Sequence, residues 1–503
     1  MVALSCAAGL LLRFFAATPM WLDEALTANI AELAPAQIFD ALRSDGHPPL
    51  FYLLSHYWGA AFGQSDFALR ALPGLLSLLA ALAIWFAGRR LGGRILAWVS
   101  VAVFALSPLA VRYASENRMY SLVMLEVALG WLLVDDLVSG RRKGWRVPAL
   151  AVVAGALLWT HYWGIFLLAA TALVIAARWW FVGRRSGDRR GLWAIGSIVA
   201  GCVIFLPWVP SFLTQLSSTG TPWAVPARPT SSLGILLGDF SAGRTGESLI
   251  VAALVGVLVV LAMFAKRGAT PSEILLNLRT QPGVRSEVAV VLLTLFIGAG
   301  LGWLGGTVFQ SRYGAVIVPL AVLVISFGVV IVEHRVARAI LFAGLLLGGS
   351  VAGWFELVTD RSQMGDIAAA IADDVQAGDV VAYCPDQLGP AGDRALRAQL
   401  GPDAGGLVQV SVPTLEGPRF VDWVDYAERN ESADPVAVGR AIADLAPPGG
   451  QVFFVWNGGY RTYEGLCEGV LETLTRAFPE ASELVTINGG DFFETATLVR
   501  LRR

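Results

Sequence analysis

The chain has 503 residues, of which 55 % are hydrophobic and only 15 % are charged, and its formal net charge is −2. Soluble domains carry about 25 % charged residues, so this composition is too apolar for a single soluble body. The slightly negative net charge argues against nucleic acid as the main partner. The composition therefore favours an integral membrane protein.

Eleven segments are predicted to be transmembrane helices, because a bilayer core about 30 Å thick needs roughly 20 apolar residues for each crossing. The segments are 2–18, 69–88, 95–111, 119–138, 147–162, 164–182, 192–212, 248–265, 287–307, 314–332 and 336–358. No basic residue precedes the first apolar run, so we expect a membrane helix there and not a cleaved signal peptide.

The loops between these segments predict the orientation of the chain. Arginine and lysine gather in alternate loops, at residues 89–94, 141–146, 184–190, 266–285 and 335–338, and are sparse in the others. Basic loops face the cytoplasm, so the N-terminus is predicted to be cytoplasmic and the C-terminus extracytoplasmic. Lysine occurs only at Lys143 and Lys266, a bias typical of a GC-rich bacterium, and we expect a bacterial plasma membrane protein.

The composition changes near residue 359, where Asp, Glu, Gly and Pro become frequent and no segment could cross a membrane. Helix-like stretches alternate with strand-like ones, which predicts an α/β fold. The helix-like stretches are 364–375, 393–400 and 466–478, and the strand-like ones are 380–385, 451–456, 483–488 and 495–502. We therefore divide the chain into a transmembrane domain, 1–358, and an extracytoplasmic α/β domain, 359–503.

The four cysteines are divided between the two predicted domains. Cys6 and Cys202 fall in predicted membrane helices, whereas Cys384 and Cys467 fall in the α/β domain. A disulfide is permitted outside the cytoplasm, but we expect Cys384 and Cys467 to be two buried free thiols.

An acidic pair, Asp23 and Glu24, follows the first predicted helix. Two adjacent carboxylates beside hydrocarbon are costly unless a cavity, a metal ion or a partner receives them. The alternative is structural, with Asp23 capping a short helix and Glu24 favouring the helix dipole.

The next two outer loops carry further polar residues. His47 precedes two prolines, and it is either a polar tip at the membrane interface or part of a site near the acidic pair. Residues 112–120 contain Arg112, Glu116, Arg118 and Tyr120. Arginine and tyrosine could anchor this loop at the membrane boundary, or the guanidinium groups could bind phosphate oxygens.

Two later outer junctions add His161, in a Thr-His-Tyr-Trp run, and Arg312 with Tyr313. Arg312 is a candidate phosphate ligand, with snorkelling to the interface as the alternative. Glu126 lies inside the fourth predicted membrane helix, where an acid is a functional candidate by default, although the sequence names no partner for it.

Together these junctions place carboxylates, arginines, histidines and tyrosines on one predicted side of the membrane. That combination suits transfer of a sugar from a phosphate-activated lipid. The arginines would hold the phosphate, and a carboxylate would take the proton from the acceptor hydroxyl.

Five runs in order resemble the bacterial GT-C glycosyltransferases, in particular the protein O-mannosyltransferase-like (family 39) and lipid A aminoarabinose transferase-like enzymes. The runs are WLDEALTANI, GHPPLFYLLSHYWGAAFGQSDFALRALPGLLSLLA, SPLAVRYASENRMYSL, THYWG and SRYGAVIVPLAVLV. The resemblance covers about residues 1–330. It implies a polytopic α-helical membrane fold, a polyprenyl-phosphate sugar donor, and an inverting single displacement on the extracytoplasmic face.

The resemblance also implies roles for individual residues. Asp23 matches the general base, Glu24 adjoins it, and Glu116 matches the acid of the second outer loop, where Ser115 replaces the glutamine common in relatives. Arg118, Tyr120 and Arg312 match positions that contact the donor phosphate, and His47 matches the His-Pro-Pro motif that lines the site. From their place in the outer loops and junctions, Arg112 and Tyr313 are also expected to bind the donor phosphate and His161 to line the site.

The sequence indicates the sugar, the acceptor and the need for a metal less specifically than it indicates the donor lipid. Mannose is the first expectation and arabinose the second, and the acceptor is a cell-envelope glycan, a glycolipid or a protein. Some relatives need a divalent metal, which Asp23, Glu24 and Glu116 could bind, but we do not expect one to be required.

Two other classes fit the hydropathy. A transporter or flippase of a lipid-linked sugar would need polar residues near the middle of the membrane and broken helices in paired halves. If the protein were a non-catalytic receptor or assembly factor, its activity would not depend on Asp23. Most unusual charges lie at predicted outer helix ends, which favours the transferase.

Overall fold

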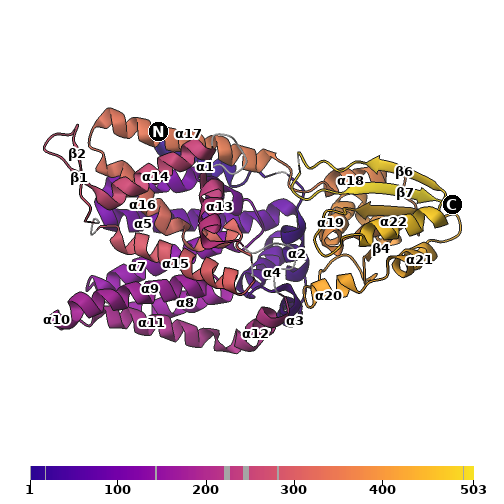
Figure 1. Cartoon of the computed structure of the whole chain (residues 1–503), viewed down its shortest axis with the longest axis horizontal. Helices are drawn as coiled ribbons and strands as arrows, with labels where there is room; N and C mark the ends of the chain where they lie inside the picture. The colour runs from indigo at the N-terminus through magenta and orange to yellow at the C-terminus, as the bar shows by residue number, and fades with distance from the viewer. Residues whose placement is uncertain are drawn as a thin grey trace.

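The structure is a computed structural model, which describes residues 2–16, 18–141, 144–219, 227–241, 248–279, 283–306, 308–490 and 492–503. Ala17 and Thr307, near the ends of two predicted membrane segments, and the loop residues Arg142, Lys143 and Arg244 lie outside the described residues. Figure 1 shows a helical part and an α/β part side by side along the long axis of the molecule.

Three short helices lie between these two parts (Figure 1). After α1 (Val2–Leu12) the chain forms α2 (Leu22–Ala31), α3 (Pro35–Asp45) and α4 (Leu50–Phe62). Pro35 starts α3, and Gly46 ends it in the left-handed conformation with φ 88°, which glycine adopts without steric cost. The turn from Gly46 to α4 carries His47, and α2 carries Asp23 and Glu24.

The longest helical stretch, α5 (Asp66–Leu106), is broken at Gly92 and Gly93. Gly93 has φ 84°, a conformation that L side chains rarely adopt. Beyond the break the chain turns back on itself, and a Cβ atom at Gly88 would lie only 2.9 Å from the Cα of Ala97. The break separates the predicted segments 69–88 and 95–111.

Shorter helices and turns complete the helical part. They are α6 (Pro108–Ala114), α7 (Tyr120–Val138), α8 (Arg146–Thr160), α9 (Gly164–Arg178), a π-helical turn (Trp179–Gly183), α10 (Arg184–Ser186), α11 (Arg190–Phe205), a 3₁₀ turn (Leu206–Trp208), α12 (Val209–Ser218), α13 (Pro229–Ser241), α14 (Ser248–Phe264), the hairpin β1 (Ala265–Arg267) and β2 (Ile274–Leu276), α15 (Arg285–Leu304), a 3₁₀ turn (Ser311–Val316), α16 (Val318–Ile331) and α17 (Arg335–Val358).

Each of the eleven predicted segments contains described helix. By length and composition, five described stretches are long and apolar enough to cross a membrane: Asp66–Leu106, Gly164–Ser186, Arg190–Ser218, Arg285–Leu304 and Arg335–Val358. Shorter apolar helices are Val2–Leu12, Arg146–Thr160, Ser248–Phe264 and Val318–Ile331. The multi-pass character is therefore supported, and the count of eleven crossings stays a prediction.

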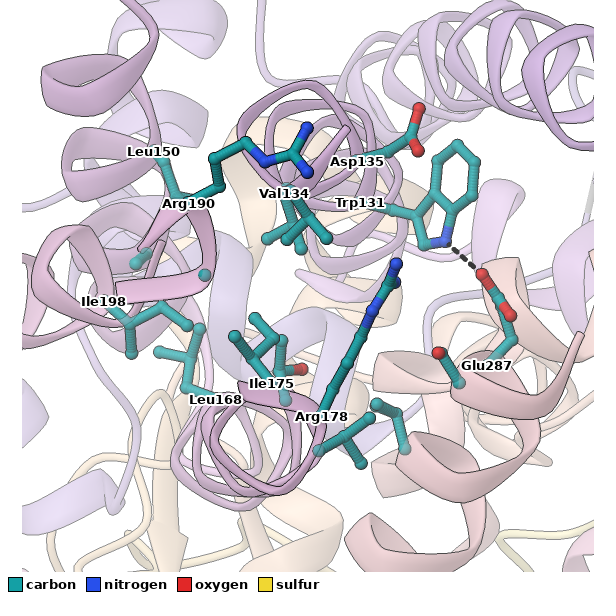
Figure 2. A pocket seen from close by; sticks show the side chains of 18 of the residues that line it. Trp131, Val134, Asp135, Leu150, Leu168, Ile175, Arg178, Arg190, Ile198 and Glu287 are labelled. Atoms are coloured by element: carbon teal, nitrogen blue, oxygen red, sulfur yellow. Dashed lines mark hydrogen bonds between the residues drawn. The ribbon is translucent and has the colours of Figure 1, made fainter. Parts of the chain in front are cut away.

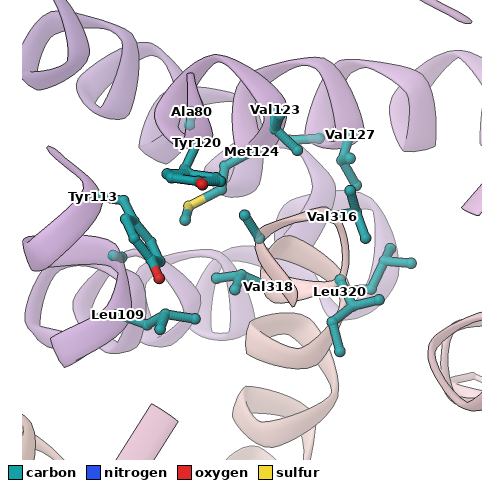
Figure 3. Close-up of a cluster of buried hydrophobic side chains, with 14 of the residues drawn as sticks. Ala80, Leu109, Tyr113, Tyr120, Val123, Met124, Val127, Val316, Val318 and Leu320 are labelled. Atoms are coloured by element: carbon teal, nitrogen blue, oxygen red, sulfur yellow. The ribbon is translucent and has the colours of Figure 1, made fainter. Parts of the chain in front are cut away.

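A buried cluster joins α5, α6, α7 and the start of α16 (Figure 3). The rings of Tyr113 and Tyr120 pack with centroids 4.5 Å apart, and Val316 and Leu320 fill the space beside them. The 3₁₀ turn that precedes α16 carries Arg312. The cluster therefore fixes Arg312 relative to the start of α7.

The chain beyond Gln363 forms a five-stranded sheet with helices packed against it. Its elements are α18 (Met364–Ala372), β3 (Val380–Cys384), a 3₁₀ turn (Asp386–Leu388), α19 (Gly389–Leu400), a 3₁₀ turn (Gly401–Gly406), β4 (Val408–Ser411), α20 (Tyr426–Glu431), α21 (Pro435–Leu445), β5 (Val452–Trp456), α22 (Leu466–Ala477), β6 (Glu480–Val485) and β7 (Thr497–Arg502). The strand order is β4-β3-β5-β7-β6, with β3 parallel to β4 and β5, and β7 antiparallel to β5 and β6.

This part agrees with most of the predicted alternation of helices and strands, but the sequence did not predict β4, α20 or α21. The residues of β4, Val408–Ser411, are partly exposed at one edge of the sheet, so they lack a long apolar run. The domain division and the extracytoplasmic location stay predictions.

The expectation of two free thiols in the α/β part is wrong. Cys384, at the end of β3, and Cys467, in the first turn of α22, form a disulfide with Cα atoms 5.6 Å apart. The two cysteines are 83 residues apart in the sequence, and only the packing of α22 beside the end of β3 brings them together. Cys6 and Cys202 are free.

We predict that Cys467→Ala lowers the stability of the α/β part by about 2–4 kcal/mol, because the disulfide restricts the unfolded chain. The measurement is proteolysis of the full chain in detergent, with cleavage sites mapped to residues 364–503. Cys202→Ala, at an exposed position of α11, is the control. Equal resistance of both variants would mean that the disulfide adds little to this part.

Candidate active site

A cavity of about 1070 Å³ lies where the helical part meets the α/β part. Six of the predicted site residues line it: Asp23, His47, Arg118, His161, Arg312 and Tyr313. Its wall between α9 and α15 is apolar and aromatic, with Phe166, Leu301 and Phe309. A large pocket with few converging polar groups is the usual form of a ligand site.

Asp23 faces this cavity from the first turn of α2. Trp21 is the N-cap residue of the helix and makes no side-chain cap bond, so Asp23 does not have the capping role considered from the sequence. Arg312 Nη1 donates to Asp23 Oδ2 at 2.8 Å, and Arg118 Nη2 lies 3.8 Å from the same oxygen. Burial opposes ionisation, but Arg312 and Arg118 hold the pKa of Asp23 below its ordinary value.

Arg118 is fixed by several acceptors and is only 2 % exposed. Its Nη1 donates to Thr27 Oγ1 at 2.8 Å and to the carbonyl oxygen of Asp23 at 3.2 Å. Its Nη2 lies 3.0 Å from His47 Nε2. Since a guanidinium group only donates, His47 Nε2 accepts this bond.

That bond sets the tautomer of His47. The proton of a neutral imidazole is then on Nδ1, which lies 2.9 Å from Asp45 Oδ2. The hydroxyl of Tyr52 donates to the same carboxylate oxygen at 2.9 Å. Asp45 therefore orients His47, which in turn orients Arg118 toward Asp23.

Glu24 does not line the cavity. It is fully buried, and Arg70 of α5 donates to its two oxygens at 2.8 and 2.7 Å. The backbone N–H of Asn117 donates to Oε1 at 2.9 Å. Burial opposes ionisation, but Arg70 lowers the pKa of Glu24. The two adjacent carboxylates thus have different surroundings: one faces open space and the other a fixed cation.

Glu116 and Arg112 also lie behind the cavity wall. Glu116 Oε1 accepts a bond from Trp21 Nε1 at 3.0 Å, and Arg361 Nη1 lies 3.4 Å from Oε2. Arg112 pairs with Glu356 of α17 at 3.4 Å and lies 3.7 Å from Glu116. In this arrangement Glu116 and Arg112 connect the loop before α7 to α17 and to Arg361.

An aromatic group lies beside the arginines. The Tyr313 ring stacks on Trp163 with centroids 5.7 Å apart and lies 5.7 Å from the His161 ring. The Tyr120 ring lies 5.8 Å from the same His161 ring. Within the described residues, the buried Tyr120 hydroxyl has no hydrogen-bond partner, although the residue itself does not line the cavity.

The α/β part closes the cavity with residues that the sequence did not single out. They are Gln387, Trp423, Asn457, Gly459, Tyr460, Arg461, Phe493 and Glu494. Glu494 is 2 % exposed, and its Oε2 accepts the N–H of Leu22 at 3.3 Å. Its Oε1 has no partner among the described residues, and burial raises the pKa of Glu494 to about 8.

Comparisons with known proteins bear on this arrangement. A family model described as dolichyl-phosphate-mannose-protein mannosyltransferase matches residues 46–210. Comparison with curated protein sequences gives no match. Among solved structures, the chain is similar to ArnT from Cupriavidus metallidurans in the apo state, with 15 % identity, 99 % of this chain and 97 % of ArnT covered, and a TM-score of 0.59.

Two further structures are similar over most of the chain. ArnT bound to undecaprenyl phosphate has 15 % identity and a TM-score of 0.57, with 99 % of this chain and 97 % of that chain covered. The archaeal oligosaccharyltransferase AglB from Archaeoglobus fulgidus, in complex with an inhibitory peptide and a dolichol-phosphate, has 11 % identity and a TM-score of 0.51, with 93 % and 71 % covered.

The chain has the GT-C glycosyltransferase fold. The family match over residues 46–210 and the similarity in fold over nearly the whole chain confirm the resemblance drawn from the sequence. The matched segment contains His47, Arg118 and His161, whereas Asp23 and Arg312 lie outside it. The fold brings these five residues to one cavity.

The carboxylates considered for a divalent metal do not gather in this GT-C structure. Glu24 is held by Arg70, Glu116 by Trp21, and Asp23 by Arg312. Among the residues that the structure describes, no three His, Cys, Asp or Glu side chains form a group that could hold a metal ion. Each of these three carboxylates therefore accepts a hydrogen bond from a nitrogen atom of a neighbouring side chain.

The residues missed from the sequence fall into two classes. Arg70 belongs to a motif quoted above and Asp45 immediately precedes that motif, where it could have been found as the acid two residues before the histidine. Arg361 and Glu494 carry no local signal, because they reach α2 only when the end of the chain folds over it.

We predict that Arg70→Leu destabilises the protein by about 3–5 kcal/mol, because it leaves the buried Glu24 carboxylate without its main cation. The measurement is unfolding in detergent. Arg43→Leu is the control, since Arg43 lies on the exposed face of α3 and, within the described part of the chain, forms an ion pair only with Asp40 at 3.4 Å. If both variants unfolded like the wild type, the Glu24–Arg70 pair would not be structural.

Proposed function

We propose that this chain is a membrane glycosyltransferase that moves a sugar from a polyprenyl-phosphate donor to a cell-envelope acceptor. The observation that carries the proposal is the Asp23 carboxylate, which faces a large cavity and lies within ion-pair distance of Arg312 and Arg118. A base beside two cations is what transfer from a phosphate ester needs. The cations stabilise the leaving phosphate, and the base accepts the proton.

The donor side of the cavity is supported by the comparisons. ArnT was solved with undecaprenyl phosphate, and the matching family is described by dolichyl-phosphate-mannose. Here Arg312 and Arg118 are the candidate phosphate ligands, with Tyr313 beside them, and the apolar wall of Phe166, Leu301 and Phe309 offers a surface for an isoprenoid chain. The placements of Arg112 and Tyr120 behind the wall favour a supporting role for these two.

Arg312 has a second role in this proposal. Without donor its charge is balanced by Asp23. A donor phosphate at Arg312 would replace that carboxylate as the counter-ion, and loss of the attraction would raise the proton affinity of Asp23. Binding of the donor would then prepare the base for the acceptor.

The reaction we propose is a single inverting displacement. The acceptor oxygen attacks the anomeric carbon, the bond from that carbon to the phosphate oxygen breaks, and the acceptor proton passes to Asp23. Polyprenyl phosphate leaves with its new negative charge facing Arg312 and Arg118. Glu24 and Glu116 position the loops that carry Asp23 and Arg118 and do not touch the reacting atoms.

The acceptor side is assigned to the α/β part, which lines the same cavity. Glu494 offers a carboxyl oxygen with no partner among the described residues, and its raised pKa keeps it protonated near neutrality. A neutral carboxyl donates a hydrogen bond, so Glu494 is the candidate group to orient an acceptor or sugar hydroxyl toward Asp23.

The location of the protein, its division into domains, the sugar and the acceptor are proposed as the sequence indicates them. We propose a multi-pass protein of a bacterial plasma membrane, with residues 1–358 as the transmembrane catalytic domain and 359–503 as the extracytoplasmic domain. Mannose is favoured, since the family description names it, and arabinose is second. The acceptor class is a glycan, a glycolipid or a protein.

A transporter or flippase of a lipid-linked sugar is the second candidate. It is favoured by Glu126, a buried acid in α7 that lines a second cavity. That cavity shares no lining residue with the one that contains Asp23. A path for a sugar headgroup across the bundle would need the two to join, which makes transport the weaker reading.

We predict that Asp23→Asn lowers transfer roughly 10²–10⁴-fold at equal protein level, as loss of a general base does. The assay uses membranes that lack the native gene, radiolabelled polyprenyl-phosphate mannose and arabinose, and envelope acceptors. Asp40→Asn, on the exposed face of α3, should transfer like the wild type. Undiminished transfer by Asp23→Asn would assign the base to another residue, and no transfer by the wild type from either donor would favour transport.

We predict that Arg312→Gln weakens binding of undecaprenyl phosphate roughly tenfold or more, because a charge-assisted hydrogen bond is lost. It should also move the acid limb of the kcat/KM profile for the donor to higher pH, because in the free enzyme Arg312 lowers the pKa of Asp23 and keeps the base ionised in mild acid. Arg335→Gln, at the exposed start of α17, is the control. Unchanged lipid affinity with an unchanged acid limb would remove Arg312 from the site.

A further inference from the structure

A second cavity, of about 430 Å³, lies inside the helical part. It follows α7 from Glu126 to Ser139, a length of about 20 Å at the helix rise of about 1.5 Å per residue. It opens near Ser139, Ser186 and Asp188, at the end of α7 opposite to Arg118 and the α/β part. This site is separate from the cavity that contains Asp23.

The walls of the second cavity are apolar through most of its depth. Figure 2 shows Val134, Leu150, Leu168, Ile175 and Ile198 facing one another from α7, α8, α9 and α11. An empty apolar cavity does not hold water well, and the atoms that line it lack dispersion contacts on one side. A hydrocarbon chain would supply those contacts.

The opening is polar, and most of its charged groups are already paired. Arg190 makes a bidentate pair with Asp188, donating from Nε to Oδ1 at 2.9 Å and from Nη2 to Oδ2 at 2.7 Å. Asp135 pairs with Arg141 and lies 3.9 Å from Arg90.

Glu287 and Trp131 form one side of the opening. Glu287 Oε1 accepts a bond from Trp131 Nε1 at 3.0 Å, as the dashed line in Figure 2 marks. Trp179 lies at the same end of the cavity, and tryptophan favours the depth of the membrane interface.

Arg178 is the exception. Its side chain extends from α9 into the cavity (Figure 2), and among the described residues no ion pair is formed with it. Glu287 and Asp188 act on the charge of Arg178 at longer range, and neither forms an ion pair with it. An arginine at interface depth that contacts no carboxylate is suited to a phosphate headgroup.

The closed end limits what can enter. Glu126 accepts a bond from Thr160 Oγ1 at 2.9 Å and is 5 % exposed. A chain that enters at Ser139 must end before this carboxyl, because burying alkyl atoms against a polar group has no compensating bond. The cavity therefore suits one acyl chain and not a long isoprenoid.

We propose that this cavity binds one acyl chain of an anionic phospholipid, with the lipid phosphate held by Arg178. The lipid comes from the leaflet at this end of the bundle and fills the space between α7, α8, α9 and α11. It is a structural ligand, distinct from the sugar donor at the other end.

The test uses the full chain in nanodiscs of equal parts phosphatidylglycerol and phosphatidylcholine, and native mass spectrometry counts the lipids retained after transfer to detergent. The wild type should retain one phosphatidylglycerol. Gly130→Leu should retain roughly tenfold less phosphatidylglycerol or lower still, because the leucine side chain would occupy the cavity that Gly130 lines. An added Cβ at this position meets only Val153, at 3.8 Å, so the backbone accepts the change. Gly196→Leu, at an exposed glycine of α11 with open space around it, is the matched control.

Arg178→Gln tests the headgroup independently of the fold, because Arg178 is exposed. It should abolish the preference for phosphatidylglycerol over phosphatidylcholine while a lipid is still retained. The proposal is overturned if the wild type shows no preference, if Gly130→Leu retains the lipid as Gly196→Leu does, or if added undecaprenyl phosphate displaces it mole for mole.

Discussion

The buried ion pair between Glu24 and Arg70 is the interaction on which the site depends. It joins the first turn of α2 to α5, and the same carboxylate accepts the N–H of Asn117 and lies 3.8 Å from Arg361. A carboxylate without water is stable only if its oxygens have such donors. The pair therefore brings four parts of the chain to one point. Because successive residues of a helix are turned by about 100°, holding Glu24 inward directs Asp23 toward the cavity.

Around Asp23 the charges are balanced before any substrate is present. Arg312 and Arg118 both approach the carboxylate, and Arg118 is itself held by Thr27 and by His47. The chain of bonds from Asp45 to His47 to Arg118 gives each group one orientation. In the reaction that we propose, such an arrangement reduces the reorganisation needed when charge develops on the leaving phosphate. It also explains why a histidine and an acid separated by one glycine belong to the site without touching the reacting atoms.

The sequence predicted the residues whose chemistry is conspicuous at a helix end, but it could not tell which of them face open space. Asp23 and Glu24 are adjacent and alike, and only the position of Arg70 separates their roles. The same limit applies to Arg112 and Arg118, one paired with Glu356 behind the wall and the other at the cavity. The disulfide and Glu494 were out of reach for another reason. Each depends on contacts between segments far apart in the chain, such as Leu22 with Glu494, for which no local pattern exists.

The α/β part completes the cavity with Glu494, a carboxyl group whose pKa is shifted in the opposite direction to that of Asp23. Arg312 and Arg118 lower the pKa of Asp23, whereas burial without a cation raises that of Glu494 to about 8. Both groups line the same space, and Glu494 contacts the backbone of the residue next to Asp23. Two carboxyls with pKa values pushed apart can hold different protonation states at one pH, one accepting a proton and the other donating a hydrogen bond. Because Glu494 enters only with the last strand of the sheet, the helical part alone supplies the two arginines and the proposed base but lacks this proposed donor.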